Sequence, residues 1–307
     1  MADKPIRDDL KLSNLLPPLF ICLVIGTIWS VYTCLHLLPL LQIGVPAAFQ
    51  DVSAVRRGSL QAMISQLLVS LFLTCYTRAC LTSPGEVPDT PEWRLGSAHV
   101  PSTREVKNTG ERRICKWCMK YKPDRCHHCR VCKTCVLKMD HHCPWIMNCV
   151  GWGNHKFFFL VVVYAATTCT FIFFTVLESV AASVDKDMPH LNRFLLVLCM
   201  MLAFIMGTLM IIFLGFHTCL MLRAMTTIEF CEKGTMVRAA GTPNYDRGVW
   251  ENVTQVLGPR PLLWLLPTDP ARGDGMHFGR LDDPVSEQGD PEWTSVAAGQ
   301  RAPLHQG

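Results

Sequence analysis

Four long runs of apolar residues dominate the hydropathy pattern of this chain. They cover residues 15–41, about 60–81, 157 to about 177, and 194–221. Each matches or exceeds the roughly 20 residues that a helix needs to cross the hydrocarbon core of a bilayer. Helices buried in a soluble core rarely run this long without an amphipathic stripe, so we favour membrane spans over a soluble helical fold. The pattern predicts an all-α polytopic membrane protein with four transmembrane helices.

Polar segments divide the chain around these runs. Residues 1–14 form a mixed-charge N-terminal segment, residues 15–81 hold the first two helices, and residues 82–156 form a long polar segment. Residues 157–221 hold the other two helices, followed by a polar region over residues 222–268. Only short polar loops are expected at residues 50–58 and 183–193. Residues 269–307 are rich in Gly, Pro, Asp and Arg, which predicts a disordered tail.

The distribution of basic residues predicts the orientation in the membrane. Segment 82–156 contains 13 Lys and Arg residues, whereas the two short loops hold only Arg56, Arg57, Lys186 and Arg193. Basic residues concentrate on the cytoplasmic side, so the central segment and both termini are expected in the cytosol. The sequon at Asn252 would then stay unmodified. We expect a Golgi or ER membrane, with the plasma membrane or another endomembrane as alternatives.

Composition supports this interpretation and narrows the partners. Half of the residues are hydrophobic and 18% are charged, which is unusual for a soluble domain. The net charge of +4 is modest, and we expect no nucleic-acid partner. The 16 cysteines could indicate a disulfide framework, but the polar N-terminal segment is not a cleavable signal peptide. We therefore expect reduced, cytosol-facing cysteines that bind metal.

Two features of the C-terminal region predict contact with the membrane surface. Residues 245–257 place Val249, Val253 and Val256 at helical spacing, which predicts a short amphipathic helix that ends at Gly258. Residues 261–267 are apolar but too short to span a bilayer. They are expected to enter the headgroup region, with Trp264 as an interfacial anchor.

The polar segment between the second and third helices contains the strongest chemical signal. Eight cysteines and four histidines lie between residues 115 and 149, and two tetrahedral zinc sites need eight donors. Cysteines two residues apart can bind one metal together, so spacing indicates the following ligands: Cys115, Cys118, Cys129 and Cys132. Spacing does not decide which histidines join them, or whether Cys126 or Cys143 is left out. A purely structural zinc knuckle remains an alternative.

A run of four residues, Asp140 to Cys143, adds a candidate nucleophile. In an extended backbone His141 and Cys143 point to one side and His142 to the other, so His142 can face a metal. A histidine beside a thiol can act as its base, and Asp140 can orient the ring of His141. The alternative is that all four residues only bind or surround metal.

Several motifs carry a resemblance to the DHHC family of protein S-acyltransferases. The cysteine-rich core provides the specific part: Cys115-x-x-Cys118, Lys122-Pro123-x-Arg125, His127-His128-Cys129, Asp140-His141-His142-Cys143-Pro144-Trp145 and Asn148-Cys149-Val150-Gly151, with Asn154 and Phe158 beyond it. Weaker flanking motifs are Ser83-Pro84-Gly85, with Ser in place of the usual Asp, Thr226-Thr227-x-Glu229, and Asn252. The resemblance covers roughly residues 15–260.

The resemblance implies two structural zinc ions in the cytosolic segment between helices 2 and 3. One site would use Cys115, Cys118, His128 and Cys135, and the other Cys129, Cys132, His142 and Cys149. Cys126 would be a spectator, His127 a neighbour of the metal site and His155 a loop residue.

The resemblance also implies a two-step reaction. Cys143 would accept a palmitoyl group from acyl-CoA, with His141 as base and Asp140 as orienting acid. It would then pass the acyl group to cysteines of membrane-associated substrate proteins at the cytosolic face. Lys122 and Arg125 would meet the CoA phosphates, and Trp145 would pack at the membrane surface near the thioester.

Two other functions compete with this one. A membrane-embedded zinc adaptor, or a catalytically silent homologue, would bind metal and recruit partners without transferring an acyl group. A membrane-anchored RING-type ubiquitin ligase is disfavoured because the gap between its ligand pairs is longer than the gap in this chain, and because it gives Asp140 and His141 no role.

Overall fold

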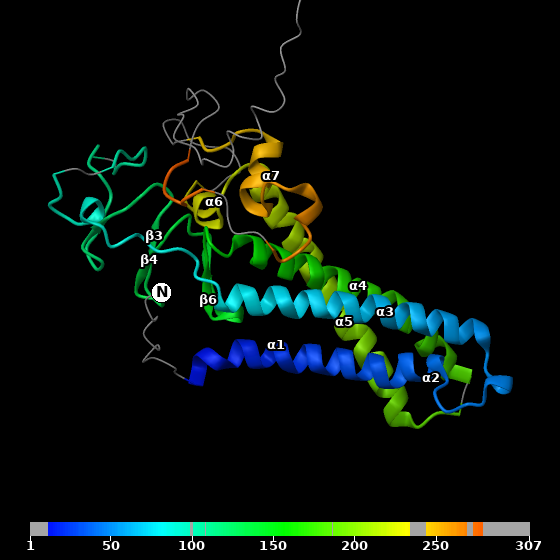
Figure 1. Ribbon diagram of the computed structural model, residues 1–307. Coiled ribbons are helices and arrows are strands. Elements are labelled where there is room, and N and C mark those ends of the chain that lie inside the picture. Colours follow the sequence, from blue (N-terminus) through cyan, green and yellow to red (C-terminus); the bar gives the residue numbers. More distant parts are fainter. Residues whose placement is uncertain are drawn as a thin grey trace, which may run out of the picture.

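Four long helices form the body of the molecule, and the other elements gather at one end of it (Figure 1). The computed structural model describes residues 12–98, 101–107, 109–185, 187–233, 244–268 and 273–278. Within these residues, four helices are long and apolar enough to cross a membrane, as predicted. The cysteine-rich segment lies beside the ends of the helices, together with α6 (Thr227–Lys233) and α7 (Val249–Leu257).

The first span is built from three helical pieces in continuous succession. Helix α1 (Leu12–Val31) passes through a π-helical turn, η1 (Tyr32–Leu37), into α2 (Leu38–Leu41). The widened turn carries His36, whose ring nitrogens bond Ser179 at 2.7 Å and Gln61 at 2.8 Å. A buried polar side chain within a membrane span needs such partners, so this residue joins three spans.

The other spans are longer than their apolar runs. Helix α3 covers Val52–Leu81, α4 covers His155–Asp185 and α5 covers His190–Leu222. The expected polar turn over residues 50–58 is therefore wrong from residue 52 onward, because the Asp51 carboxylate accepts hydrogen bonds from the Ser53 and Ala54 amides and starts the helix there. The expected loop over residues 183–193 is also shorter, because α4 continues to Asp185 and α5 begins at His190. Polar residues can continue a helix beyond the bilayer.

The cysteine-rich segment consists of three small antiparallel hairpins, which the all-α prediction omitted. The first pairs β1 (Ile114–Cys115) with β2 (Lys120–Tyr121). The second pairs β3 (His127–Cys129) with β4 (Thr134–Val136), and the third pairs β5 (His141–Cys143) with β6 (Asn148–Val150). Isolated hairpins this short are unstable in water. They need support from bound metal and from packing on the helices.

A tight turn after α3 attaches the hairpins to the bundle. The Leu137 amide donates to the Gly85 carbonyl and the Gly153 amide to the Pro84 carbonyl, each at 3.0 Å. A Cβ on Gly153 would lie 2.4 Å from the Ser83 carbonyl oxygen, so only glycine fits this approach. The Ser83 hydroxyl accepts from the Gly85 amide at 3.3 Å. The departure from Asp at this position therefore keeps the acceptor that stabilises the turn.

The Asn148 side chain completes this attachment. Its amide group donates to the carbonyls of Ala79, Cys80 and Thr82 at 3.2, 3.2 and 2.9 Å. These carbonyls end α3 and lack partners within the helix. Asn148 is next to Cys149 in β6, so the same strand carries a predicted metal ligand and caps a membrane helix.

The C-terminal elements lie against this junction. The predicted amphipathic helix is shorter than expected, because residues 245–248 are not helical and Tyr245 is buried instead. Asn252 is 1% exposed and donates to the Leu222 carbonyl at 2.8 Å, which leaves no room for a glycan. A short 3₁₀ turn, η5 (Pro261–Leu263), follows, and Leu262 in it is 94% exposed.

Part of the expected disordered tail is folded. Residues 273–278 pack on the cysteine-rich segment: Gly275 lies against the Trp152 ring, and Phe278 lies 5.7 Å from Tyr245. The rest of the range 269–307 is outside the described residues, as are residues 1–11.

Candidate active site

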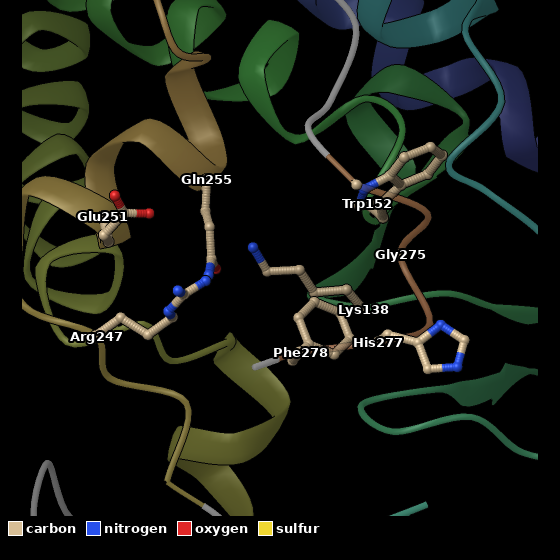
Figure 2. A pocket seen from close by; sticks show the side chains of 9 residues that line it. Lys138, Trp152, Arg247, Glu251, Gln255, Gly275, His277 and Phe278 are labelled. Atoms are coloured by element: carbon tan, nitrogen blue, oxygen red, sulfur yellow. The ribbon is translucent and has the colours of Figure 1, made fainter. Parts of the chain in front are cut away.

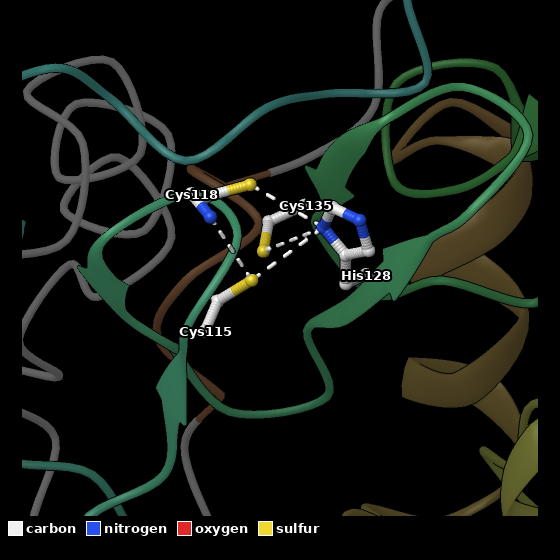
Figure 3. Close-up of side chains that lie close together, drawn as sticks. All are labelled: Cys115, Cys118, His128 and Cys135. Atoms are coloured by element: carbon white, nitrogen blue, oxygen red, sulfur yellow. Dashed lines mark hydrogen bonds between the residues drawn. The ribbon is translucent and has the colours of Figure 1, made fainter.

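Two clusters of cysteine and histidine side chains form in the hairpins (Figure 3 shows the first). In each cluster four donor atoms lie within 4.8 Å of one another. The first quartet is Cys115, Cys118, His128 and Cys135, and the second is Cys129, Cys132, His142 and Cys149. The structure thus brings together both ligand sets that the family resemblance implied.

Strand register explains how the quartets interleave. Each one combines a Cys-x-x-Cys turn with a histidine and a cysteine that face each other across the next hairpin. His128 is the cross-strand partner of Cys135, and His142 is the cross-strand partner of Cys149. The turn of the second hairpin supplies Cys129 to the second quartet. Consecutive hairpins are therefore joined through their metal sites.

The donor geometry fits zinc. Bonds of about 2.3 Å to sulfur and 2.0–2.1 Å to nitrogen in a tetrahedron place donors about 3.5–3.8 Å apart. The sulfur-to-Nδ1 distances are 3.5, 3.3 and 3.9 Å in the first quartet and 3.7, 3.5 and 3.6 Å in the second. Three thiols and one imidazole with this spacing, and no open position, match a structural zinc site.

Cys143 is close to the second quartet but belongs to neither. Alternation along β5 turns His142 toward the metal donors and leaves His141 and Cys143 on the other face. Cys143 is 5% exposed and packs with apolar side chains of the membrane helices, including Ala79, Phe157 and Phe158. The thiol therefore lies where the hairpins meet the lipid-facing bundle.

Two polar side chains lie next to the thiol. The Nδ1–H of His141 donates to Asp140 Oδ2 at 2.7 Å, and His141 shares one face of β5 with Cys143. Burial disfavours the charged ring, but the Asp140 carboxylate and the nearby Cys143 side chain outweigh it and raise the pKa of His141 to about 9. The ring of Phe158 meets His141 edge-on at 5.1 Å and holds its orientation. Such an arrangement can accept the thiol proton and stabilise the resulting ion pair.

Comparison with known proteins agrees with this geometry. The DHHC palmitoyltransferase family model matches residues 108–234. The chain is 35% identical to the probable protein S-acyltransferase 16 of Arabidopsis thaliana, over 72% of this chain and 82% of that protein. It is 37% identical to the probable protein S-acyltransferase 15 of the same plant, over 74% of this chain and 91% of that protein.

An animal relative matches over a shorter range. Human palmitoyltransferase ZDHHC15 is 37% identical, over 55% of this chain and 51% of that protein. The chain belongs to the DHHC palmitoyltransferase family.

Thr227 anchors the acid of this DHHC palmitoyltransferase, a contact that the sequence did not reveal. Its amide donates to Asp140 Oδ1 at 2.9 Å and its hydroxyl to Oδ2 at 2.8 Å. Desolvation of the buried carboxyl opposes ionisation, but the hydrogen bond from His141 and the charges of nearby histidines favour the carboxylate, and the pKa of Asp140 falls below its usual range. The sequence signal for this contact was the Thr226-Thr227-x-Glu229 motif, which marked Thr227 as part of a family motif but did not indicate that it binds Asp140.

Arg125 lies elsewhere than the sequence predicted. It is 1% exposed, and its guanidinium donates two hydrogen bonds to the Glu229 carboxylate, from Nε to Oε1 at 2.6 Å and from Nη2 to Oε2 at 2.9 Å. Tyr245 covers it, with the ring centre 4.6 Å from the guanidinium carbon. A group held in this way does not reach a phosphate in the cytosol. Arg125 instead fixes α6, which carries Thr227.

The remaining predicted positions are accessible or peripheral. Lys122 is half-buried, and its charge helps to lower the pKa of the neighbouring His127, for which burial is the main cause. Trp145 is 46% exposed, its ring lies 6.2 Å from Phe20, and its carbonyl accepts from the Tyr76 hydroxyl at 2.8 Å.

Two further residues complete the picture. Cys126 is fully buried in the core under the first quartet and belongs to neither donor set. His155 is not a loop residue as expected, because it begins α4 and is 8% exposed.

Proposed function

We propose that this acyltransferase carries a palmitoyl group from acyl-CoA to Cys143 and then to a cysteine of a membrane-associated protein. The observation that carries the proposal is the placement of Cys143: the neighbouring cysteines and His142 belong to two complete donor quartets, while Cys143 belongs to neither and shares one face of β5 with His141. Cys126 also lies outside the quartets, but it has no histidine base and is enclosed in the core.

In the first step His141 removes the thiol proton at Nε2, since Nδ1 is engaged by Asp140. The Cys143 thiolate attacks the thioester carbonyl carbon, the C–S bond to CoA breaks, and the CoA sulfur leaves with the proton returned by His141. In the second step a substrate cysteine loses its proton to His141 and attacks the acyl-enzyme thioester. Cys143 is regenerated as the thiol. Zinc held by the two quartets would supply rigidity to the hairpins that carry Cys143 and His141.

The surroundings of Cys143 suit the two ends of the donor. The apolar cluster of α3, α4 and α5 can receive a chain whose burial contributes about 0.8 kcal/mol per CH₂. Lys122 lies on the polar side, where it can meet a CoA phosphate, and Trp145 lies at the boundary between the two. Arg125 takes no part in phosphate binding in this proposal.

The orientation in the cell is part of the proposal. The excess of basic residues in the cysteine-rich segment favours the cytosolic side for the active site. A Golgi or ER membrane is the compartment to test, by imaging the full chain in cells.

Incorporation of labelled palmitoyl-CoA tests the function. Wild-type protein is expected to gain a label that hydroxylamine releases, and Cys143→Ser is expected to gain none while retaining two zinc ions. Cys219→Ala is the control, because Cys219 is an exposed cysteine of α5 outside both quartets and the apolar cluster, and its loss should leave the label unchanged. Label in Cys143→Ser, or its loss in Cys219→Ala, would refute the assignment. An adaptor without activity would give no label in any variant.

A further inference from the structure

A pocket on the side of the cysteine-rich segment gathers positive charge that the proposed reaction does not use (Figure 2). The pocket, called the Lys138 pocket here, has a volume of about 130 Å³. Its walls come from four separate regions of the chain: the link between β4 and β5, Trp152 after β6, helix α7 with the residues before it, and the segment 273–278. Its polar lining includes Lys138, Arg247, Glu251 and Gln255.

Lys138 is the unusual group in this pocket. It is 6% exposed, and among the described residues none accepts a hydrogen bond or ion pair from its amine. Figure 2 shows the amine directed into the space between α7 and Phe278. Desolvation, reinforced by the charge of Arg125 and opposed by Glu229 and Asp140, lowers the pKa of Lys138 to about 7. The amine opens into the pocket and has no partner of its own in the described part of the protein, so it can bind an anion there.

Arg247 faces the same space from the other side. Its guanidinium reaches toward the Gln255 amide and the Lys138 amine in Figure 2. Its Nε is buried and has no hydrogen-bond partner among the described residues. Two cationic groups that converge on one cavity repel each other unless an anion lies between them.

Two of the acidic side chains near the pocket already bind other groups. Glu229 is held by both donors of Arg125, and Asp274 binds the His277 ring at 2.5 Å as well as two backbone amides. Glu251 is the one carboxylate among the lining residues that the structure describes, and it faces two cations. The pocket therefore retains net positive charge.

The wall opposite α7 is built by specific packing. Gly275 has φ +72°, and a Cβ there would lie 2.6 Å from the Trp152 ring. Gly273 likewise has φ +79°. Phe278 stacks 5.2 Å from the Arg125 guanidinium carbon. Glycines in a conformation that other residues avoid allow this segment to lie flat on the indole and close the cavity.

We propose that the Lys138 pocket binds a phosphate group, held by the Lys138 amine, the Arg247 guanidinium and the Gln255 amide. A guanidinium and an ammonium are the donors that bind phosphate best, and the volume admits one phosphate group. The phosphate belongs either to a lipid headgroup, since α7 lies beside the membrane helices, or to a soluble phosphorylated compound. The site is independent of the acyl donor and of Cys143.

Bound phosphate would join the link that precedes Asp140 to α7 and to segment 273–278. Lys138 is two residues before Asp140, and the Met139 amide between them donates to the Arg125 carbonyl at 3.1 Å. The ligand would therefore stabilise the backbone that presents the catalytic acid.

Thermal unfolding of the full-length, zinc-loaded protein tests this inference. Inorganic phosphate is one probe, and nanodiscs containing phosphatidylinositol 4-phosphate, compared with pure phosphatidylcholine, are the other. The wild type is expected to be stabilised saturably by at least one of them. Lys138→Met and Arg247→Gln should each weaken that response about 10- to 100-fold, the value of one lost charge-assisted hydrogen bond. Arg260→Gln is the control, because Arg260 is exposed and lies outside the pocket.

The ligand-free variant separates a binding role from a structural one. Without phosphate, Lys138→Met should unfold at a higher temperature than the wild type, because it removes an unpaired buried charge. A larger response to the nanodiscs assigns the site to a headgroup, and a larger response to inorganic phosphate assigns it to a soluble ligand. The proposal is wrong if neither probe stabilises the wild type, or if both pocket variants respond as Arg260→Gln does. Two zinc ions per chain in each variant verify the fold.

Discussion

The buried ion pair between Arg125 and Glu229 gives the most demanding test of the structure. Glu229→Gln keeps the shape of the side chain but leaves the guanidinium without a counter-charge. Arg125 cannot turn to water, because it also donates to the Ala224 carbonyl at 2.8 Å and lies under Tyr245. Breaking one side of a buried pair costs about 3–5 kcal/mol. We expect Glu229→Gln to lower the unfolding temperature by roughly 6 °C or more.

An exposed pair supplies the matched control. Arg57 and Glu178 are 3.0 Å apart, but their side chains are 48% and 45% exposed, so Glu178→Gln should cost less than about 1 kcal/mol. The double variant Arg125→Met/Glu229→Leu should be more stable than Glu229→Gln alone, since no unpaired charge remains. Thermal unfolding in detergent measures all three. Equal losses for Glu229→Gln and Glu178→Gln would refute the reasoning, as would a double variant that is less stable than Glu229→Gln.

Four further predictions follow from the site. Thr227→Val removes the hydroxyl donor from Asp140 and should slow acyl loading about tenfold or more in a labelled palmitoyl-CoA assay, whereas Thr227→Ser should stay near wild type. His141→Ala should slow loading by about 10²–10⁴, and normal loading would exclude it as the base. Cys129→Ser should release one zinc ion per chain, measured by metal analysis, and unfold the second and third hairpins. Lys138 has a folded pKa of about 7 against about 10.4 when unfolded, so its burial makes stability fall as pH drops from about 10 to 7. The wild type should lose stability relative to Lys138→Met over that range, and parallel curves would contradict this.

Local sequence signals located most of the elements and much of the site. Length of apolar sequence is enough to locate a membrane span, so all four spans were found. The alternation of a short strand is equally local. It placed His141 and Cys143 on one face and His142 on the other without knowledge of the fold, and the structure has that arrangement.

Contacts between distant residues could not be predicted in this way. Thr227 reaches Asp140 across 87 residues, and Glu229 reaches Arg125 across 104. Neither motif indicates which distant residue it contacts. Arg125 was therefore expected to bind the CoA phosphates, whereas in the structure Glu229 neutralises its charge in the interior. Hydropathy also did not locate helix ends, because a cap such as Asp51 extends a helix beyond the membrane.

Composition misled in one segment for a physical reason. Glycine and aspartate are frequent in disordered chains, and they made residues 269–307 resemble one. In residues 273–278 the same residues have other uses: Gly275 permits contact with the Trp152 ring, and Asp274 caps the turn that follows it. Composition alone does not distinguish a glycine that is needed for its positive φ, such as Gly275, from a glycine in a disordered segment.

The third hairpin links the metal sites to the chemistry. One face of β5 contributes His142 to the second quartet, and the other face carries His141 and Cys143, so zinc in that quartet would fix the strand without binding Cys143, the proposed nucleophile. The first quartet holds the reactive strand only through the second hairpin. Loss of the second quartet should therefore abolish acyl loading directly, whereas loss of the first acts through the hairpin between them. Glu229 supports the same strand from α6 through Thr227, a route that needs no metal, and its disruption should reduce loading while both zinc ions stay bound.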